Sequence, residues 1–122
     1  MARPKTIICD IDGTLVWHRP GNGPSHILTH PAEILDGTIE KLEEWDKKGY
    51  NIILLTGRKE SLREKTERDL QKLGIFYDML IMGVGGGARV LINDLKPSDS
   101  EDNPTAVAIT IKRNVGISDI DV

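Results

Sequence analysis

The stretch KTIICDIDGTL, residues 5–15, decides the fold, because an apolar run ends in two closely spaced acids and then a glycine. The continuously apolar middle predicts a strand from Lys5 to Ile11 that is covered on both faces, as is typical of parallel sheets. Asp10 and Asp12 then lie at the carboxyl end of this strand. Two carboxylates this close together repel each other, so either one is protonated or both face a cation.

The rest of the chain alternates between helical and strand patterns. Apolar spacing predicts a helix from Gly37 to Lys48, with Asp36 as its N-cap, and YNIILLTG from Tyr50 predicts a second buried strand. A capping-box pattern at Ser61 predicts another helix, and the runs DMLIM, RVLIN and TAVAITI predict three more strands. This order predicts an α/β fold with a mostly parallel sheet in three layers. Ligands of such sheets bind beyond the carboxyl ends of the strands.

The length of 122 residues favours a single domain over residues 1–122. The segment 17–32 is rich in proline and glycine, and we interpret it as a loop or flap inserted after the first strand. A regular helix is not expected there, so the spacing of His26 and His30 is not interpreted as a metal site. A histidine that faces solvent or substrate is favoured at both positions.

Composition excludes several classes of function. The net charge of -3 and an aromatic content of 4% argue against nucleic acid as the main partner. The single cysteine, Cys9, excludes an internal disulfide framework and fits a reducing compartment. No apolar run approaches the length that crosses a bilayer, so no membrane association is expected and we predict a cytoplasmic protein.

Two later strand ends carry polar residues that complete a site. LLTGR places Thr56, Gly57 and Arg58 at the same sheet edge as the two aspartates, where the main chain can donate to an anionic oxygen. VLIND ends in Asp94, which is the best candidate for a third oxygen ligand. Magnesium suits this set of oxygen ligands, because it binds few carboxylates, keeps several water ligands and shares phosphate oxygens.

The motifs DIDGTL, LLTGR and INDLKP, in this order, resemble the haloacid dehalogenase superfamily of phosphohydrolases. The resemblance covers nearly the whole chain and implies a Rossmann-like core with phosphoryl transfer through a covalent aspartyl phosphate. The short segment between the first two motifs leaves no room for a cap domain. The chain therefore resembles the capless branch, which includes capsule-polysaccharide phosphatases, sugar-phosphate phosphatases and the phosphatase domains of polynucleotide end-processing enzymes.

The resemblance also implies a role for individual residues. Asp10 would be the nucleophile, Asp12 the general acid and then the base, and Thr56 would hold the transferring phosphoryl group. Magnesium would be bound by the Asp10 carboxylate, the main-chain carbonyl of Asp12 and Asp94. The main-chain N–H groups that line the phosphate site would be those of Ile11, Asp12 and Gly57.

The chain departs from this superfamily at the positive charge that normally neutralises the phosphoryl group. No lysine lies between Lys72 and Lys96, and we take Arg89 as the substitute, since a guanidinium pairs with phosphate oxygens in a fork. An exposed charge at the start of a strand is the alternative for Arg89. Arg58 either contacts the substrate, which we favour, or caps carbonyls of the following helix.

Several other features of the sequence allow two interpretations each. Asp99 either supports the metal site or is a turn acid in PSDSED, and the turn is favoured. His18, directly after the first motif, either contacts the leaving group or packs within the flap. MGVGGGA, residues 82–88, resembles a dinucleotide fingerprint, but a strand pattern follows it where that fingerprint needs a helix. We interpret this segment as a flexible loop near the site.

Taken as a whole, the sequence predicts a magnesium-dependent phosphomonoesterase that acts on a sugar phosphate or a related small metabolite. One alternative is a phosphatase of nucleotides or polynucleotide ends, because an open site admits bulky substrates. Another is a catalytically weak module that binds phosphate or regulates a partner, because the usual lysine is missing. An open site can also use a neighbouring subunit as its lid, which would make the protein a homo-oligomer.

Overall fold

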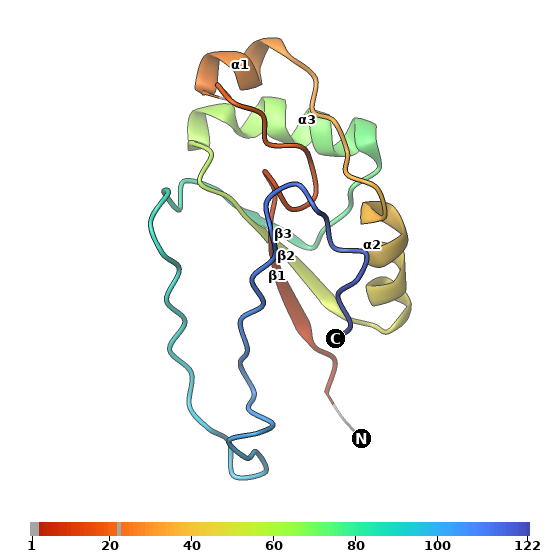
Figure 1. Ribbon diagram of the computed structural model, residues 1–122, viewed down its shortest axis with the longest axis vertical. Helices are drawn as coiled ribbons and strands as arrows, with labels where there is room; N and C mark the ends of the chain where they lie inside the picture. The colour runs from red at the N-terminus through yellow and green to blue at the C-terminus, as the bar shows by residue number, and fades with distance from the viewer. Residues whose placement is uncertain (1–2, 22) are drawn as a thin grey trace.

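The computed structural model describes residues 3–21 and 23–122, and its centre is a three-stranded parallel sheet with the strand order β1-β2-β3 (Figure 1). This confirms the predicted α/β class and the parallel sheet, and the described residues contain no cap domain. Residue 22 of the predicted flap and residues 1–2 of the predicted domain lie outside the described residues. The strands are β1 (Thr6–Asp10), β2 (Asn51–Leu55) and β3 (Met79–Ile81).

The two predicted helices are present, with small differences at their ends. Gly37, and not Asp36, is the N-cap of α2, and the capping box predicted at Ser61 is not formed because a 3-10 turn precedes α3. Gly74 ends α3 with a φ of 77°, a left-handed conformation that glycine adopts without strain. The helical elements are α1 (Pro24–Thr29), α2 (Thr38–Lys47), the 3-10 turn η1 (Glu60–Leu62) and α3 (Arg63–Leu73).

The flap contains a short helix where the sequence predicted only a loop. Helix α1 begins at Pro24, and a proline is tolerated in the first turn because its missing N–H has no partner inside the helix. The expectation that this segment forms a loop without a regular helix was therefore wrong. None of the residues of α1 is fully buried, but Ile27 is partly buried and packs against the edge of the core.

Helices α2 and α3 pack on one face of the sheet. The strands follow one another in a single direction, and right-handed crossovers in one direction put their connecting helices on the same face. On this face the register aligns Cys9 with Leu54 and Leu54 with Leu80. These three side chains form the buried core together with residues of both helices and flanking loops, among them Leu42, Trp45 and Leu70.

The opposite face of the sheet is largely exposed. Ile8 in β1 is 53% exposed and Met79 in β3 is 52% exposed. The prediction that the first strand is covered on both faces is therefore wrong for β1, whose burial alternates along the strand. An apolar run shows that a strand tolerates burial on both of its faces. Which face of the sheet is covered by a helix is decided by the direction of the crossover connections.

The predicted strands RVLIN and TAVAITI are not strands in the structure. Residues 83–113 first pass along the loop that follows β2, then extend from the body as a long excursion, and return to it near the carboxyl edge of the sheet (Figure 1). Val90 is 81% exposed and Ile92 is 91% exposed, so neither side chain contributes to the core. An apolar run becomes a strand only where a neighbouring edge accepts its main-chain hydrogen bonds, and these runs have no such partner within the described residues.

The C-terminal residues return to the body and pack on it. Ile117 is 1% exposed and belongs to the core. Lys41 in α2 donates a hydrogen bond to the carbonyl of Ile120 (2.8 Å), and the Tyr50 hydroxyl donates to the carbonyl of Val122 (3.1 Å). Within the described part of the chain, no helix is long and apolar enough to span a bilayer.

The thiol of Cys9 gives a direct test of this packing. Burial raises its pKa to about 12, and the nearby charge of Asp10 contributes to the rise. Because the thiolate is the reactive form, we expect iodoacetamide at pH 8 to leave native protein unmodified and to alkylate Cys9 fully in guanidinium chloride. Mass spectrometry of the two samples measures this difference. Equal alkylation rates in both samples would contradict the buried position of Cys9.

Candidate active site

The two aspartates of the first motif lie together at the carboxyl edge of the sheet. Asp10 is the last residue of β1, and Asp12 follows the buried Ile11. The carbonyl of Ile11 accepts hydrogen bonds from the main-chain N–H groups of the next turn, at 2.9 to 3.2 Å. This turn ends the strand and directs both carboxylates to the same end of the sheet, as the sequence predicted.

The surroundings of Asp10 disfavour the charge of its carboxylate. Desolvation by the surrounding protein raises its pKa, and the negative charge of Asp12 raises it further. The N–H of Ile11, the charge of Arg89 and the Thr14 hydroxyl, 3.5 Å away, oppose this rise. The ionised form of Asp10 is therefore held at an energetic cost, which a nearby cation would relieve.

Asp12 is held by an arginine fork. Nε of Arg58 donates to Oδ2 of Asp12 (2.9 Å), and Nη2 donates to Oδ1 (2.8 Å). The third nitrogen, Nη1, donates to the hydroxyl of Thr66 in α3 (3.0 Å). The Arg58 side chain is only 7% exposed, and Thr66 is fully buried. Arg58 was predicted to bind substrate, but in this structure its guanidinium orients Asp12.

Thr56 and Gly57 lie beside the aspartates, directly after β2. Thr56 is 1% exposed, and its hydroxyl accepts a hydrogen bond from the N–H of Arg58 (3.1 Å). The N–H of Thr56 donates to the carbonyl of Ile81 (3.0 Å), and its carbonyl accepts from the N–H of Val84 (3.2 Å). The loop that carries the hydroxyl is therefore fixed by β3 and by the residues that follow it.

The glycine-rich loop lies against Gly57, near the aspartates, as the sequence predicted. A side chain at Gly57 would place its Cβ 2.8 Å from the carbonyl oxygen of Gly85, so only glycine fits this approach. The same Cβ position lies 3.8 Å from Nη2 of Arg89. Arg89 is exposed, donates to the carbonyl of Gly87 (2.8 Å) and lowers the pKa of Asp10. Arg89 therefore lies near Gly57, and its charge acts on Asp10, while its role as the missing positive charge stays a prediction.

The structure does not bring Asp94 to this edge. Its carboxylate pairs with Lys96 in the exposed excursion, because the run before it does not form a strand beside β1. Among the residues that the structure describes, no cluster of three histidine, cysteine, aspartate or glutamate side chains is placed to bind a metal ion. Asp99 accepts hydrogen bonds from the N–H of Lys96 (2.8 Å) and from Thr105, so it is a turn acid.

A residue that the sequence analysis missed holds the first motif in place. Both ends of the Asn114 side chain bind the main chain of His18: Oδ1 accepts from its N–H (2.7 Å) and Nδ2 donates to its carbonyl (2.9 Å). The N–H of Asn114 also donates to the carbonyl of Gly13 (2.8 Å). With a φ of 65°, Asn114 has a left-handed conformation, which asparagine adopts more readily than most residues. The only feature of the sequence that could have indicated this turn is an asparagine two residues before a glycine.

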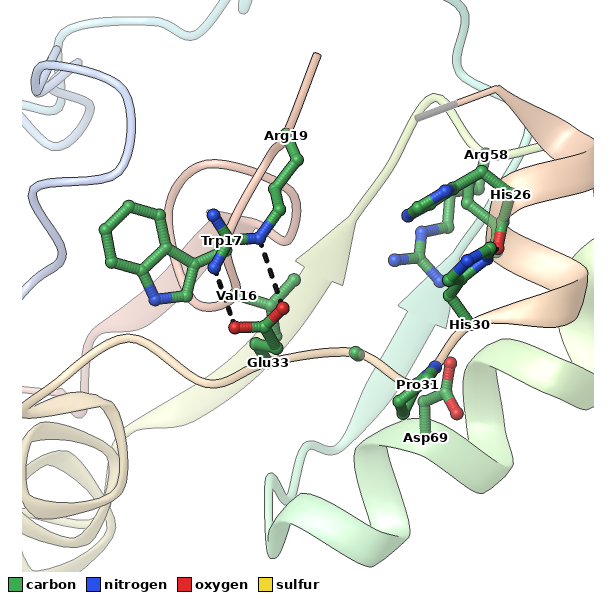
Figure 2. Close-up of a pocket in the computed structure, with 11 residues that line it drawn as sticks. Val16, Trp17, Arg19, His26, His30, Pro31, Glu33, Arg58 and Asp69 are labelled. Carbon is green, nitrogen blue, oxygen red and sulfur yellow. Dashed lines mark hydrogen bonds and ion pairs between the residues drawn. The ribbon is translucent and has the colours of Figure 1, made fainter. Parts of the chain in front are cut away.

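A hollow lies beside Arg58, between the flap and α3 (Figure 2). On one side, Arg19 forms a fork with Glu33 (3.1 and 2.7 Å), and its guanidinium lies 5.1 Å from the centre of the Trp17 ring. On the other side, the rings of His26 and His30 stack with their centres 3.9 Å apart. These histidines line the hollow together with Glu33 and Asp69, but no group of three such side chains among the described residues is placed to hold a metal ion.

The edge as a whole is arranged for chemistry on a phosphate group. It presents one carboxylate that can attack, Asp10, and a second that is fixed in orientation, Asp12. A hydroxyl, small residues and a guanidinium surround them, and these groups bind anionic oxygens. Two carboxylates next to a bound anion require added positive charge. The repulsion between two like charges about 4 Å apart is on the order of 4 kcal/mol at an effective dielectric near 20.

Comparison with protein families gives a match over most of the chain. The family model described as the polynucleotide kinase PNKP phosphatase domain matches residues 4–89, which contain Asp10, Asp12, Thr56 and Arg89. A comparison with the curated proteins found no match.

Solved structures with the same fold include chains from two Pnkp1/Rnl/Hen1 complexes. A structure of a Pnkp1/Rnl/Hen1 complex contains a chain with 36% sequence identity and a TM-score of 0.58 over 71% of this chain. A structure of the Pnkp1/Rnl/Hen1 RNA repair complex gives 40% identity and a TM-score of 0.56 over 65% of this chain. This chain spans 30% and 25% of the lengths of those two chains.

A third structure is a crystal structure of an MCSG target from Vibrio cholerae. Its sequence identity is 22%, its TM-score is 0.51, and the match covers 77% of this chain and 85% of that one. At this level of identity the likeness concerns the fold alone.

Proposed function

The chain belongs to the family of polynucleotide kinase PNKP phosphatase domains, within the haloacid dehalogenase superfamily of phosphatases, and on this premise we propose that it removes the terminal phosphate from polynucleotide ends. The observation that carries the proposal is the family match over residues 4–89, which includes both aspartates and Thr56. The sequence alone favoured a sugar phosphate, because the net charge of -3 offers no broad basic surface. Family membership now supports the polynucleotide alternative.

The open architecture of the site also supports a large substrate. No cap domain covers the carboxyl edge of the sheet in the described residues, and Asp10 is accessible to solvent. A polynucleotide end can therefore approach Asp10 without a domain movement. The charge balance of the whole chain does not oppose this, because the cations that matter are the few arginines beside the aspartates.

The proposed reaction has two steps. In the first, an Asp10 carboxylate oxygen attacks phosphorus, the bond from phosphorus to the ester oxygen breaks, and the Asp12 carboxyl gives its proton to that oxygen. In the second, Asp12 takes a proton from water, the water oxygen attacks the aspartyl phosphate, and the bond from phosphorus to Asp10 breaks. Inorganic phosphate leaves, and both aspartates return to their starting states.

Magnesium is the cofactor that we propose for this site. Its donors would be the carboxylate of Asp10 and the main-chain carbonyl of Asp12, because the fork of Arg58 engages both carboxylate oxygens of Asp12. The raised pKa of Asp10 supports a cation there, since it reflects the cost of a desolvated charge beside a second negative one. The ion would supply positive charge that offsets the repulsion between the nucleophile and the phosphate. Asp94 remains a proposed third ligand, away from this edge in the conformation described.

A substrate panel tests the proposal. In magnesium buffer, we expect phosphate release from a 3′-phosphorylated oligonucleotide with a kcat/KM at least about tenfold above that for any sugar phosphate. We expect EDTA to abolish the activity and magnesium to restore it, because the charge repulsion at Asp10 is otherwise uncompensated. Released phosphate is measured with a colorimetric assay, with boiled protein as the blank.

Other outcomes of the panel assign other functions. Faster turnover of a sugar phosphate than of any polynucleotide end would identify the protein as a phosphatase of small metabolites, which is the function that the sequence first indicated. Binding of magnesium and phosphate without hydrolysis of any ester would identify a phosphate-binding module. Activity that persists after complete chelation would contradict the proposed cofactor.

A further inference from the structure

The chain that returns from the excursion brings the Arg113 side chain next to the first motif. Asn114 fixes the main chain here, because its N–H donates to the carbonyl of Gly13 and its side chain holds His18 at both main-chain atoms. The residue just before it, Arg113, is therefore held beside the first motif. Figure 1 shows this returning segment close to the turn that follows β1.

The side chain of Arg113 lies directly over Gly13. Its Cγ is 3.0 Å and its Cδ is 3.8 Å from the position that a Cβ of Gly13 would take. Gly13 follows Asp12 in the chain, and Asp12 is the group that meets the departing ester oxygen in the proposed reaction. Arg113 consequently lies next to the turn that carries Asp12.

Arg113 has no protein partner for its charge in the described part of the chain. Within residues 3–21 and 23–122, its guanidinium forms no salt bridge and no hydrogen bond, whereas Arg19, Arg58, Arg63 and Arg68 each pair with a carboxylate. Such a cation beside the first motif, in a chain of net charge -3, is placed to bind an anion from outside.

The opposite side of the site already has its own cation. Arg89 lies near Gly57, where the phosphoryl group is bound in the proposed reaction, and it contacts the carbonyl of Gly87. One guanidinium suffices for a single terminal phosphate. A second one, on a side chain anchored beside Gly13, fits a substrate that carries another phosphate in its leaving group. A polynucleotide end has this property, whereas a nucleoside monophosphate or a simple sugar phosphate does not.

We propose that Arg113 binds the internucleotide phosphate next to the terminal phosphate, and that it thereby determines specificity for polynucleotide ends. This inference rests on the proposed function of the same site. Arg113 contacts only the leaving group, so it contributes to substrate binding and leaves the chemistry at Asp10 and Asp12 unchanged. Phosphate contacts of this kind position a substrate without reading its base sequence.

The test compares Arg113→Gln with wild type on two substrates that share the same ester. For a 3′-phosphorylated oligonucleotide, we expect kcat/KM to fall about tenfold, through KM. For a nucleoside 3′-phosphate, which has no internucleotide phosphate, we expect no change. The slope of log kcat/KM against log salt concentration should also decrease by about 0.7 for the single-stranded oligonucleotide. Arg113→Lys keeps the charge and should retain most of this slope.

Arg68→Gln is the matched control, because it removes the same charge from the exposed surface of α3. It should change neither substrate's kcat/KM. An equal loss on both substrates, or no loss on either, would overturn the role of Arg113 and leave the proposed function standing. If wild type hydrolyses no polynucleotide end at all, the proposed function and this inference fail together.

Discussion

Replacing Asp10 with asparagine is expected to lower phosphate release by at least about 10³-fold, which is the largest effect that we predict for any single substitution. The new side chain cannot attack phosphorus, because an amide lacks the anionic oxygen that forms the covalent intermediate. The measurement is phosphate release from a 3′-phosphorylated oligonucleotide in magnesium buffer. Intact-protein mass spectrometry after an acid quench should detect a phosphorylated wild-type chain and none for the variant.

The stability of this variant separates a chemical defect from a folding defect. Neighbouring protein and Asp12 raise the pKa of Asp10, so ionisation of Asp10 costs more in the folded chain than in the unfolded one. At pH 7 the ionised carboxylate therefore destabilises the fold, and removal of its charge should leave the metal-free Tm equal or higher. Asp46→Asn, at an exposed position of α2, is the control and should keep full activity. Undiminished turnover by Asp10→Asn would exclude Asp10 as the nucleophile.

Replacing Arg58 with lysine is expected to lower kcat by roughly 100-fold, because Asp12 then loses the fork that fixes its orientation. A lysine can make one contact with Asp12 but cannot span both carboxylate oxygens and the Thr66 hydroxyl at once. The fork fixes the direction of the Asp12 carboxyl group, and the second step depends on that direction because Asp12 must take a proton from a small, mobile water molecule. Breakdown of the aspartyl phosphate should therefore slow more than its formation.

Stopped-flow kinetics with p-nitrophenyl phosphate measures this imbalance. Its leaving group needs little protonation, so the first step remains fast in Arg58→Lys, and a burst of nitrophenolate close to the enzyme concentration should precede slow turnover. Thr66→Val should give a weaker burst, since Arg58 keeps its contacts with Asp12, and Thr66→Ser should behave as wild type. Arg63→Lys, which breaks a similar fork with exposed Glu60, is the control. Loss of activity without a burst would indicate a merely structural role for Arg58.

Local patterns were sufficient to predict the elements that position the aspartates. The apolar runs before Asp10 and Thr56 form β1 and β2, and the helical spacing around Leu42 forms α2. These segments fold as predicted because burial on the helix-covered face follows the period of each element. The patterns failed for RVLIN and TAVAITI, since a strand also needs an edge to pair with, and no local pattern specifies that edge.

The partners of the site residues could not be predicted in the same way. Arg58 was expected to contact substrate, yet it binds Asp12, which lies 46 residues earlier in the chain. Asn114 holds His18 across 96 residues, and nothing in either local sequence indicates this contact. Both contacts exist because separate loops meet at one sheet edge, and the identity of the meeting side chains depends on the path of each loop.

The sequence by itself determined which residues stand at the carboxyl ends of the first two strands: Asp10 and Asp12 after one, Thr56 and Gly57 after the other. Parallel strands end at one edge, so the order of motifs was enough to bring these groups together. The tertiary structure alone decided that Arg58 is committed to Asp12, that the Arg113 side chain lies over Gly13, and that Asp94 stays in the excursion. Each of these depends on how far a loop reaches in space, which is set by packing and main-chain hydrogen bonds between distant segments.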